Sequence, residues 1–145
     1  MHRLTVALLA VAVLALASCG GSDADDTGAP GEVEFRLSER NDSNSTGVRV
    51  VLRYEDEKRT LVRIDGLDEG EPSGGGANPA RLVKGSCDEP GAVAFELEPL
   101  KGPLSETTVD VGLPELFAGE YAIEVLLTAD QPRQIACGEV PDDAP

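Results

Sequence analysis

Three cysteines and one histidine are the side chains of this 145-residue sequence best suited to nucleophilic, redox or metal chemistry. They are Cys19, Cys87, Cys137 and His2. Neither Cys87 nor Cys137 lies in a Cys-x-x-Cys motif, and no His or Lys flanks Cys137. Because reactive thiolates depend on such neighbours, the pattern favours structural cysteines, with a pair of buried or redox-active thiols as the alternative.

The first cysteine closes a segment typical of an export signal. Residues 1–18 place Arg3 before an apolar run, Leu4–Leu16, that is too short to span a membrane as a finished helix. The tetrapeptide "LASC" resembles a bacterial lipobox, in which the cysteine receives a diacylglyceryl group through a thioether and the signal is removed. Two or more acyl chains, such as palmitate, anchor a protein stably at about 0.8 kcal/mol per buried methylene. We therefore expect lipidation of Cys19; an ordinary signal peptide with a chance cysteine is the alternative.

Removal of residues 1–18 also removes His2, so the mature chain would contain no histidine. Ser-His-Asp and Cys-His arrangements, and zinc sites built from His and Cys, all require one. A carboxylate pair of the kind used in glycoside hydrolysis remains as an alternative. However, the acid-rich segments "YEDE", "DEGE" and "DDAP" are equally typical of solvated turns. The sequence thus predicts no catalytic residue, no metal ligand and no cofactor.

The charge balance excludes two classes of partner. The chain has 12 Lys and Arg against 27 Asp and Glu, a formal net charge of -15. Such a surface repels phosphate backbones and anionic headgroups, so we expect neither nucleic-acid binding nor polybasic membrane docking.

Residues 19–31 are predicted to be the lipidated cysteine and a flexible acidic tether, because "GGSDADDTGAPG" has almost nothing to bury. Five of the positions of an EF-hand-like calcium loop are nevertheless occupied, by Asp23, Asp25, Thr27, Gly28 and Glu34. Thr stands where Asp or Asn is usual, and Pro stands where an apolar residue should hold the loop. A solvated tether is the better interpretation, and calcium binding through acidic loops is kept as an alternative function.

Residues 32–142 read as one all-β domain, followed by a tail at 143–145. Apolar residues alternate with polar ones along short segments separated by Gly, Pro, Asn and Asp, and only "PELF" suggests a helical turn. The apolar positions are Val33, Phe35, Leu37, Val48, Val50, Leu52, Tyr54, Val62, Ile64, Val93, Phe95, Leu97, Val109, Val111, Tyr121, Ile123, Val125 and Ile135. This pattern predicts a Greek-key antiparallel β-sandwich or barrel of about eight strands.

If Cys19 carries lipid, Cys87 and Cys137 remain as an even pair in an oxidising compartment, which favours a disulfide. Around them, "NPARLVKGSC", "TTVDVGLPELFAGEYAIEV" and "IACGEV" resemble the copper/zinc superoxide dismutase-like sandwich, above all its bacterial secreted CHRD-type domains. The resemblance covers roughly Val48 to Val140. It implies that fold, and it implies that a loop cysteine, Cys87, pairs with the last-strand cysteine, Cys137.

The sequence departs from that family where its metal would bind. Arg81-Leu82-Val83 stands in place of a His-x-His, and Asn78 and Leu126 occupy two further histidine positions. Copper and zinc in such sites rest on neutral imidazole, so the resemblance implies a sandwich without superoxide dismutation.

Taken together, the sequence predicts a non-catalytic module of the cell envelope, anchored through Cys19 to the cell membrane and facing the extracytoplasmic space. Its partner would be an envelope protein or glycan, bound through the long loop from Gly66 to Pro79. The alternatives are divalent-cation binding, a carboxylate-based enzyme and a spacer with no ligand. We expect Arg53, Arg63, Arg81 and Lys84 to pair with neighbouring carboxylates across strands.

Overall fold

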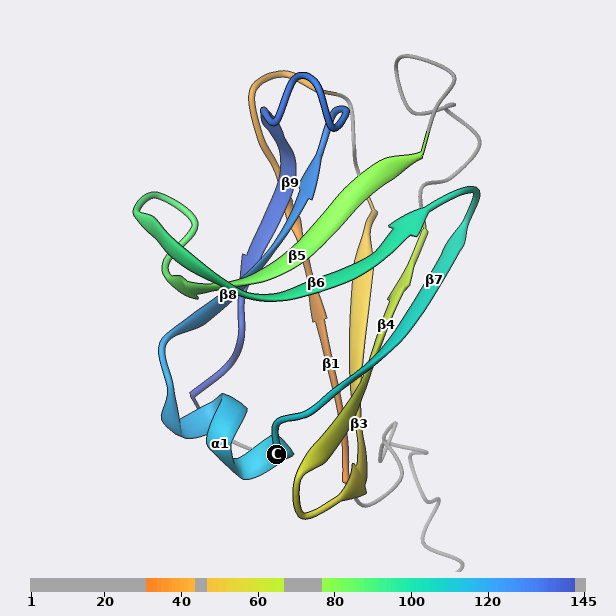
Figure 1. Cartoon of the computed structure of the whole chain (residues 1–145). Helices are drawn as coiled ribbons and strands as arrows, with labels where there is room; N and C mark the ends of the chain where they lie inside the picture. The colour runs from red at the N-terminus through yellow and green to blue at the C-terminus, as the bar shows by residue number, and fades with distance from the viewer. Residues whose placement is uncertain (1–30, 44–46, 67–76, 143–145) are drawn as a thin grey trace, which may run out of the picture.

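The computed structural model describes residues 31–43, 47–66 and 77–142, which form two antiparallel sheets packed face to face (Figure 1). The strands are β1 (Glu32–Arg36), β2 (Ser38–Glu39), β3 (Arg49–Asp56), β4 (Arg59–Asp65), β5 (Asn78–Gly85), β6 (Pro90–Leu100), β7 (Leu104–Val109), β8 (Tyr121–Leu126) and β9 (Gln134–Glu139). A short helix, α1 (Leu113–Ala118), precedes β8. The predicted all-β sandwich is confirmed.

The strand order shows how the chain crosses between the sheets. One sheet runs β1-β3-β4-β7, and the other runs β2-β9-β8-β5-β6. β4 therefore neighbours β7, and β8 neighbours β5, which are the non-sequential pairings of a Greek key. On the side where β6 leads into β7, side chains link the strands: the Ser105 hydroxyl donates to the Glu98 carbonyl, and the Glu98 N–H donates to Thr107 Oγ1 at 2.7 Å.

Aliphatic side chains from both sheets fill the space between them. Val50, Leu52, Ile64, Leu82 and Ile123 are all completely buried. They alternate along their strands with outward residues, as a sheet with one wet face requires. The period-two apolar pattern thus located most of the core correctly.

Two expected core residues are exposed. Tyr54 is 45% exposed although it is paired with Thr60 on β4. It lies just beyond the first pair of β1 with β3, beside the β3–β4 hairpin, and its N–H bonds the Gly31 carbonyl. Val93 is 41% exposed because β6 is irregular against β5: the register shifts between Leu82 and Val83, which turns part of β6 outward.

The alternation predicted no strand between Asn78 and Gly85, and Asn78 and Pro79 were assigned to the long loop that begins at Gly66. The structure makes residues 78–85 β5, which lies between β6 and β8 near the middle of its sheet. Both faces of this strand carry buried apolar residues, Leu82 inside the sandwich and Val83 outside it. No simple alternation results, so the pattern concealed a central strand.

One end of the sandwich gathers the β3–β4 hairpin, α1 and both ends of the described domain (Figure 1). A Cβ on Gly112 would lie 2.3 Å from the Glu57 carbonyl oxygen, so the start of α1 packs directly on the hairpin. We call residues 55–59, 110–120 and 140–142 the base. Among the helices that the structure describes, none is long and apolar enough to cross a membrane.

The outer face of the β1-β3-β4-β7 sheet carries a set of ion pairs. Arg49 bonds Asp65 at 3.0 Å and Arg63 bonds Asp65 at 2.9 Å, with Glu34 and Glu106 further away at 3.5 and 3.9 Å. The hydrogen bond that Arg63 donates to Asp65 raises the pKa of Arg63. These arginines are more than 40% exposed, so water screens the pairs and each adds little to the stability of the fold.

Candidate functional site: an acidic hollow beside the disulfide loop

The turn from β5 to β6 is built around a glycine and a serine. Gly85 has a φ of 88°, and a Cβ there would lie 2.6 Å from the Glu89 carbonyl oxygen, so only glycine fits. The Ser86 hydroxyl then accepts the Glu89 N–H at 3.1 Å and closes the turn. This geometry folds Cys87 back onto the outer face of β9.

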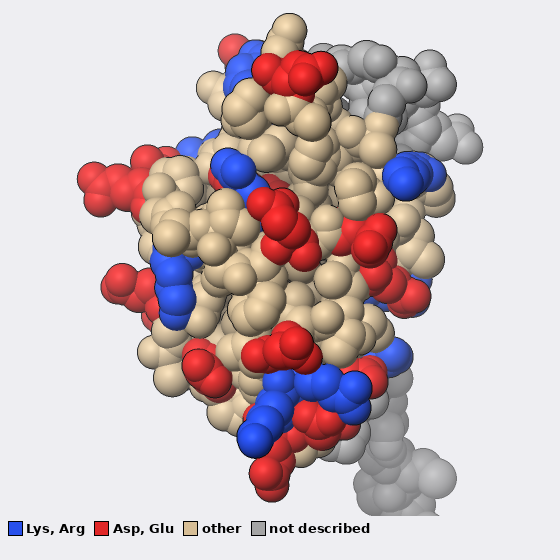
Figure 2. Space-filling view, viewed as in Figure 1, with Lys and Arg blue, Asp and Glu red and all other residues tan. Residues whose placement is uncertain are grey.

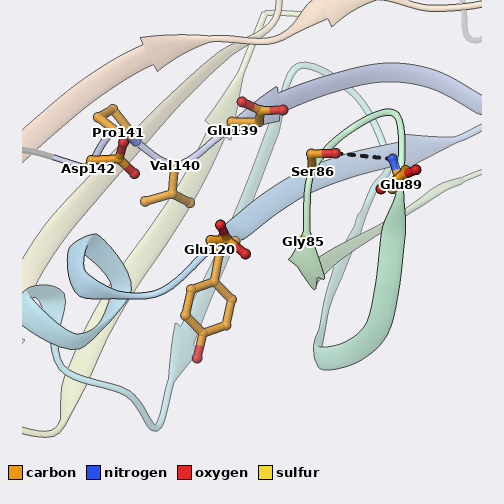
Figure 3. Close-up of a pocket in the computed structure, with 9 residues that line it drawn as sticks. Gly85, Ser86, Glu89, Glu120, Glu139, Val140, Pro141 and Asp142 are labelled. Atoms are coloured by element: carbon orange, nitrogen blue, oxygen red, sulfur yellow. Dashed lines mark hydrogen bonds between the residues drawn. The ribbon is translucent and has the colours of Figure 1, made fainter.

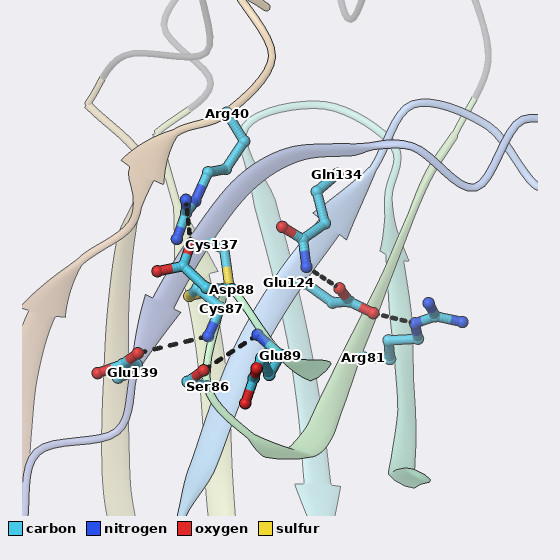
Figure 4. Close-up of a disulfide and its surroundings, with 10 residues drawn as sticks. All are labelled: Arg40, Arg81, Ser86, Cys87, Asp88, Glu89, Glu124, Gln134, Cys137 and Glu139. Carbon is cyan, nitrogen blue, oxygen red and sulfur yellow. Dashed lines mark hydrogen bonds and ion pairs between the residues drawn. A yellow bond between two sulfur atoms is a disulfide. The ribbon is translucent and has the colours of Figure 1, made fainter. Parts of the chain in front are cut away.

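Cys87 and Cys137 meet there in a disulfide, with their Cα atoms 5.8 Å apart (Figure 4). The bridge is almost completely buried together with Val83 and Ala122, in a small apolar cluster separate from the main core. An ion pair of 2.8 Å between Arg40 and Asp88 also ties the loop to the end of β2. The expected pairing is therefore present, and the disulfide and this ion pair both fix the position of the loop.

Below this loop lies a hollow with a volume of about 490 Å³ (Figure 3). It is formed where the β5–β6 turn, the start of β8 and the end of β9 converge. Its lining residues are Gly85, Ser86, Glu89, Glu120, Tyr121, Glu139, Val140, Pro141 and Asp142. Four of these carry carboxylates and none is basic, so the hollow attracts cationic groups and repels anionic ones.

Backbone hydrogen bonds fix the walls of the hollow. The Gly85 N–H donates to the Glu120 carbonyl and the Val140 N–H donates to the Tyr121 carbonyl, both at 2.9 Å. The Cys87 N–H points to Glu139 Oε1 at a longer 3.4 Å. The shape of the hollow thus depends on the main chain and on the disulfide loop, rather than on side chains alone.

Lys84, next to the hollow, was expected to pair with a carboxylate, and this prediction is wrong. Its ammonium donates to the Tyr121 hydroxyl and lies 3.7 Å from the centroid of the Tyr121 ring. A cation over an aromatic face is held by the ring quadrupole. The lysine is therefore held at the start of β8, and it does not line the acidic hollow.

A buried ion pair lies on the same outer face, one strand further in (Figure 4). Glu124 on β8 is only 1% exposed, and it accepts hydrogen bonds from Arg81 Nε and from Gln134 Nε2. The two donors come from the neighbouring strands β5 and β9 and engage different oxygens of the carboxylate. The expected cross-strand pairing of Arg81 is confirmed, but with a buried partner.

The other residues singled out in the sequence do not join this site. Cys19 and most of the EF-hand-like segment lie outside the described residues, while Glu34 belongs to the ion pairs on the opposite sheet. Most of the long loop from Gly66 to Pro79 also lies outside them. The predicted cross-strand pairing is wrong for Arg53, which pairs with Glu55 on its own strand at 3.7 Å. Arg63 reaches Glu106 across strands at 3.9 Å, but its shorter contact, 2.9 Å, is with Asp65 on its own strand.

The described residues contain no preformed metal site. Within the described ranges, no three His, Cys, Asp or Glu side chains come close enough to hold a metal ion together. Arg81, where the resemblance expects histidine, is engaged by Glu124. The hollow can therefore offer a cation single carboxylates or carboxylates acting through water, but no ready-made coordination shell.

The fold defines the class of protein: a disulfide-linked, antiparallel all-β sandwich. Comparison with known families, with curated proteins and with solved structures finds no match to this chain. The function therefore has to be argued from the residues and their geometry.

Proposed function

We propose that this protein is a lipid-anchored module of the cell envelope, facing the extracytoplasmic space and acting in binding or support rather than in catalysis. The observation that carries the proposal is the buried Cys87–Cys137 disulfide, in a chain whose remaining cysteine, Cys19, follows the export signal predicted from the sequence. Disulfides of this kind persist in oxidising compartments outside the cytoplasm. The membrane holds the chain through Cys19, and an envelope protein or glycan is the partner.

The resemblance to superoxide dismutase-like, CHRD-type sandwiches belongs to this proposal. The Greek-key order of the strands and the disulfide between a loop and the last strand support it. The composition supports the non-catalytic role: the only histidine, His2, precedes the expected cleavage site, so the mature chain would lack the residue that histidine-dependent active sites need. The buried pair of Arg81 and Glu124 is consistent with that role, since it occupies a position where the family places a metal ligand.

The anchor is tested by mass spectrometry of the mature N-terminus. We expect a chain that begins at Cys19, heavier than its sequence by a diacylglyceryl group and, where the amine is acylated, a further chain. Cys19→Ser should abolish the modification and move the protein from the membrane fraction to the soluble one. Cleavage at another residue, or an unmodified Cys19, would overturn the anchor.

A second candidate function is the binding of a divalent cation at the acidic hollow. The observation that favours it is the lining of four carboxylates without a basic residue. Calcium at ten times its dissociation constant would stabilise the domain by about 1.4 kcal/mol, seen as a higher Tm. Glu120→Gln with Glu139→Gln should remove that shift, whereas Glu96→Gln with Glu106→Gln, outside the hollow, should keep it. A Tm that calcium leaves unchanged, or changes equally in both variants, contradicts this function.

A further inference from the structure

The direction in which the chain enters the sandwich is fixed by the pairing of β1. Glu32 lies opposite Arg53, and the Tyr54 N–H bonds the Gly31 carbonyl, so the described domain begins beside the β3–β4 hairpin. Figure 1 shows this entry at the same end as α1. A tether that precedes Gly31 therefore joins the molecule at its base.

The reach of that tether is limited. Twelve residues, Gly20 to Gly31, separate Cys19 from the first strand. Whatever path they follow, they span at most about 43 Å. The eight residues of β3 alone extend for roughly 26 Å between the two ends of the sandwich. Because the tether joins the molecule at its base, an anchor on Cys19 holds the base, on average, closer to the bilayer than the opposite end.

The base carries a strong negative charge. Its seven acidic residues are Glu55, Asp56, Glu57, Asp110, Glu115, Glu120 and Asp142. Its basic residues are Lys58 and Arg59, which leaves a net charge of -5. Two hydrogen bonds lower the pKa of Asp56: the larger effect comes from the Lys58 N–H and the next from the Arg59 side chain. This carboxyl therefore stays ionised. Most of these side chains are exposed. Figure 2, viewed as in Figure 1, shows acidic side chains interspersed with basic ones at the bottom, where the base lies.

We propose that the base is the membrane-facing end of the domain and that its carboxylates repel an anionic bilayer. The inference rests on the proposed anchor at Cys19. The domain then stands off the lipid surface and presents its opposite end, with the turn between β8 and β9, to the space outside. That end is the one accessible to an envelope partner.

The range of this repulsion depends on salt. The Debye length is about 8 Å at physiological ionic strength and about 30 Å at 0.01 M. At low salt the field of an anionic bilayer covers most of the reach of the tether, whereas at physiological salt it acts only near contact. The turn between β8 and β9, roughly 26 Å further away, lies beyond several Debye lengths at physiological salt.

The test couples the chain to lipid at Cys19 with a maleimide headgroup, which makes it independent of lipidation in the cell. Bilayers of phosphatidylcholine, with or without phosphatidylglycerol, carry a gadolinium-chelating lipid that broadens nearby amide NMR signals. We expect the amides of Lys58 and Leu116 to broaden more than that of Asp130. With phosphatidylglycerol, their broadening should be weak at low salt and should increase as salt is added.

Charge reversal at the base gives the decisive comparison. Glu57→Lys with Glu115→Lys changes the base by four charges, and we expect the population in contact with the anionic bilayer to rise by about tenfold or more. The matched control, Ala129→Lys, Asp130→Lys and Gln131→Lys, adds the same four charges to the β8–β9 turn. It should leave the broadening of the base unchanged.

Three results would overturn the inference. They are equal broadening of the two ends, an equal effect of the two charge-reversal variants, and no difference between bilayers with and without phosphatidylglycerol. The mass of the mature N-terminus separates these outcomes from failure of the anchor itself. If Cys19 is unmodified in the cell, the proposed function fails even where the coupled protein behaves as expected.

Discussion

Replacing Cys87 and Cys137 together by alanine should lower the free energy of unfolding by about 4 kcal/mol, because the bridge closes a loop across 50 residues of sequence. At roughly 4 °C per kcal/mol, the Tm falls by about 15 °C. Each single replacement should cost nearly as much as the double, since either one removes the cross-link. Thermal unfolding followed by circular dichroism measures all three variants.

Two controls separate the cross-link from the packing of the sulfur atoms. Reduction of the unaltered protein keeps both side chains in the cluster with Val83 and Ala122 but opens the bond, so it should account for most of the loss. Cys19→Ser lies before the described domain and should leave the Tm unchanged. A double variant as stable as the parent protein would show that the bridge does not constrain the unfolded chain.

The loss of the bridge should also open the hollow. Cys87 fixes the turn that supplies Ser86 and Glu89, while Glu120 and Glu139 belong to paired strands. Without the disulfide, only the exposed ion pair of Arg40 and Asp88 ties the turn to β2. The stability of the fold and the shape of the candidate site thus depend on the same covalent bond.

The sequence predicted the elements whose signals are local. β3 was recognised because buried and less buried residues alternate strictly along it. Val50 and Leu52 within the strand, and Val48 just before it, are the buried positions. The helical turn in "PELF" is visible in four residues and appears as α1. The cysteine pairing followed from counting and from the resemblance, since two cysteines remain once Cys19 is assigned to lipid.

β5 was not predicted from the sequence because its two charged residues are accommodated by side chains of the neighbouring strand β8. Arg81 and Lys84 interrupt the apolar pattern, but Glu124 receives the first and Tyr121 the second. Both partners lie about 40 residues away in sequence. A central strand with two charged residues cannot be recognised until its neighbours are known.

The acidic hollow was missed for a related reason. Its carboxylates come from three places that the Greek-key topology brings together: the β5–β6 turn, Glu120 just before β8, and the end of β9 with the residues that follow it. In sequence each looks like a solvated turn. The segment "DDAP" was noticed for its charge, and its first residue, Asp142, does line the hollow, but nothing local connects it to Glu120.

The pair of Arg81 and Glu124 supplies the other large effect that we expect. Glu124 is 1% exposed and the Arg81 side chain 28%, so the carboxylate is the more deeply buried partner. Removing one member of a buried pair costs about 3–5 kcal/mol, because the other charge stays behind without its counter-ion. Arg81→Met should therefore lower the stability by an amount in this range, measured by urea unfolding.

Glu124→Leu should cost less than Arg81→Met, because the guanidinium it leaves behind is partly exposed and can turn towards water. Combining both changes should restore most of the stability, since an apolar pair of similar volume replaces the ions without a stranded charge. The double variant is then much more stable than the sum of the two single losses would predict. Additive losses would show that the two side chains do not stabilise each other.

The exposed pair of Arg53 and Glu55 provides the matched comparison. Its side chains are 52% and 35% exposed and 3.7 Å apart, so Arg53→Met should cost less than about 1 kcal/mol. Both variants replace arginine by methionine, so a difference between their stability losses reports the burial of the ion pair. If Arg81→Met is as mild as Arg53→Met, water reaches Glu124, and the outer face of β8 is more open than its contacts with Arg81 and Gln134 indicate.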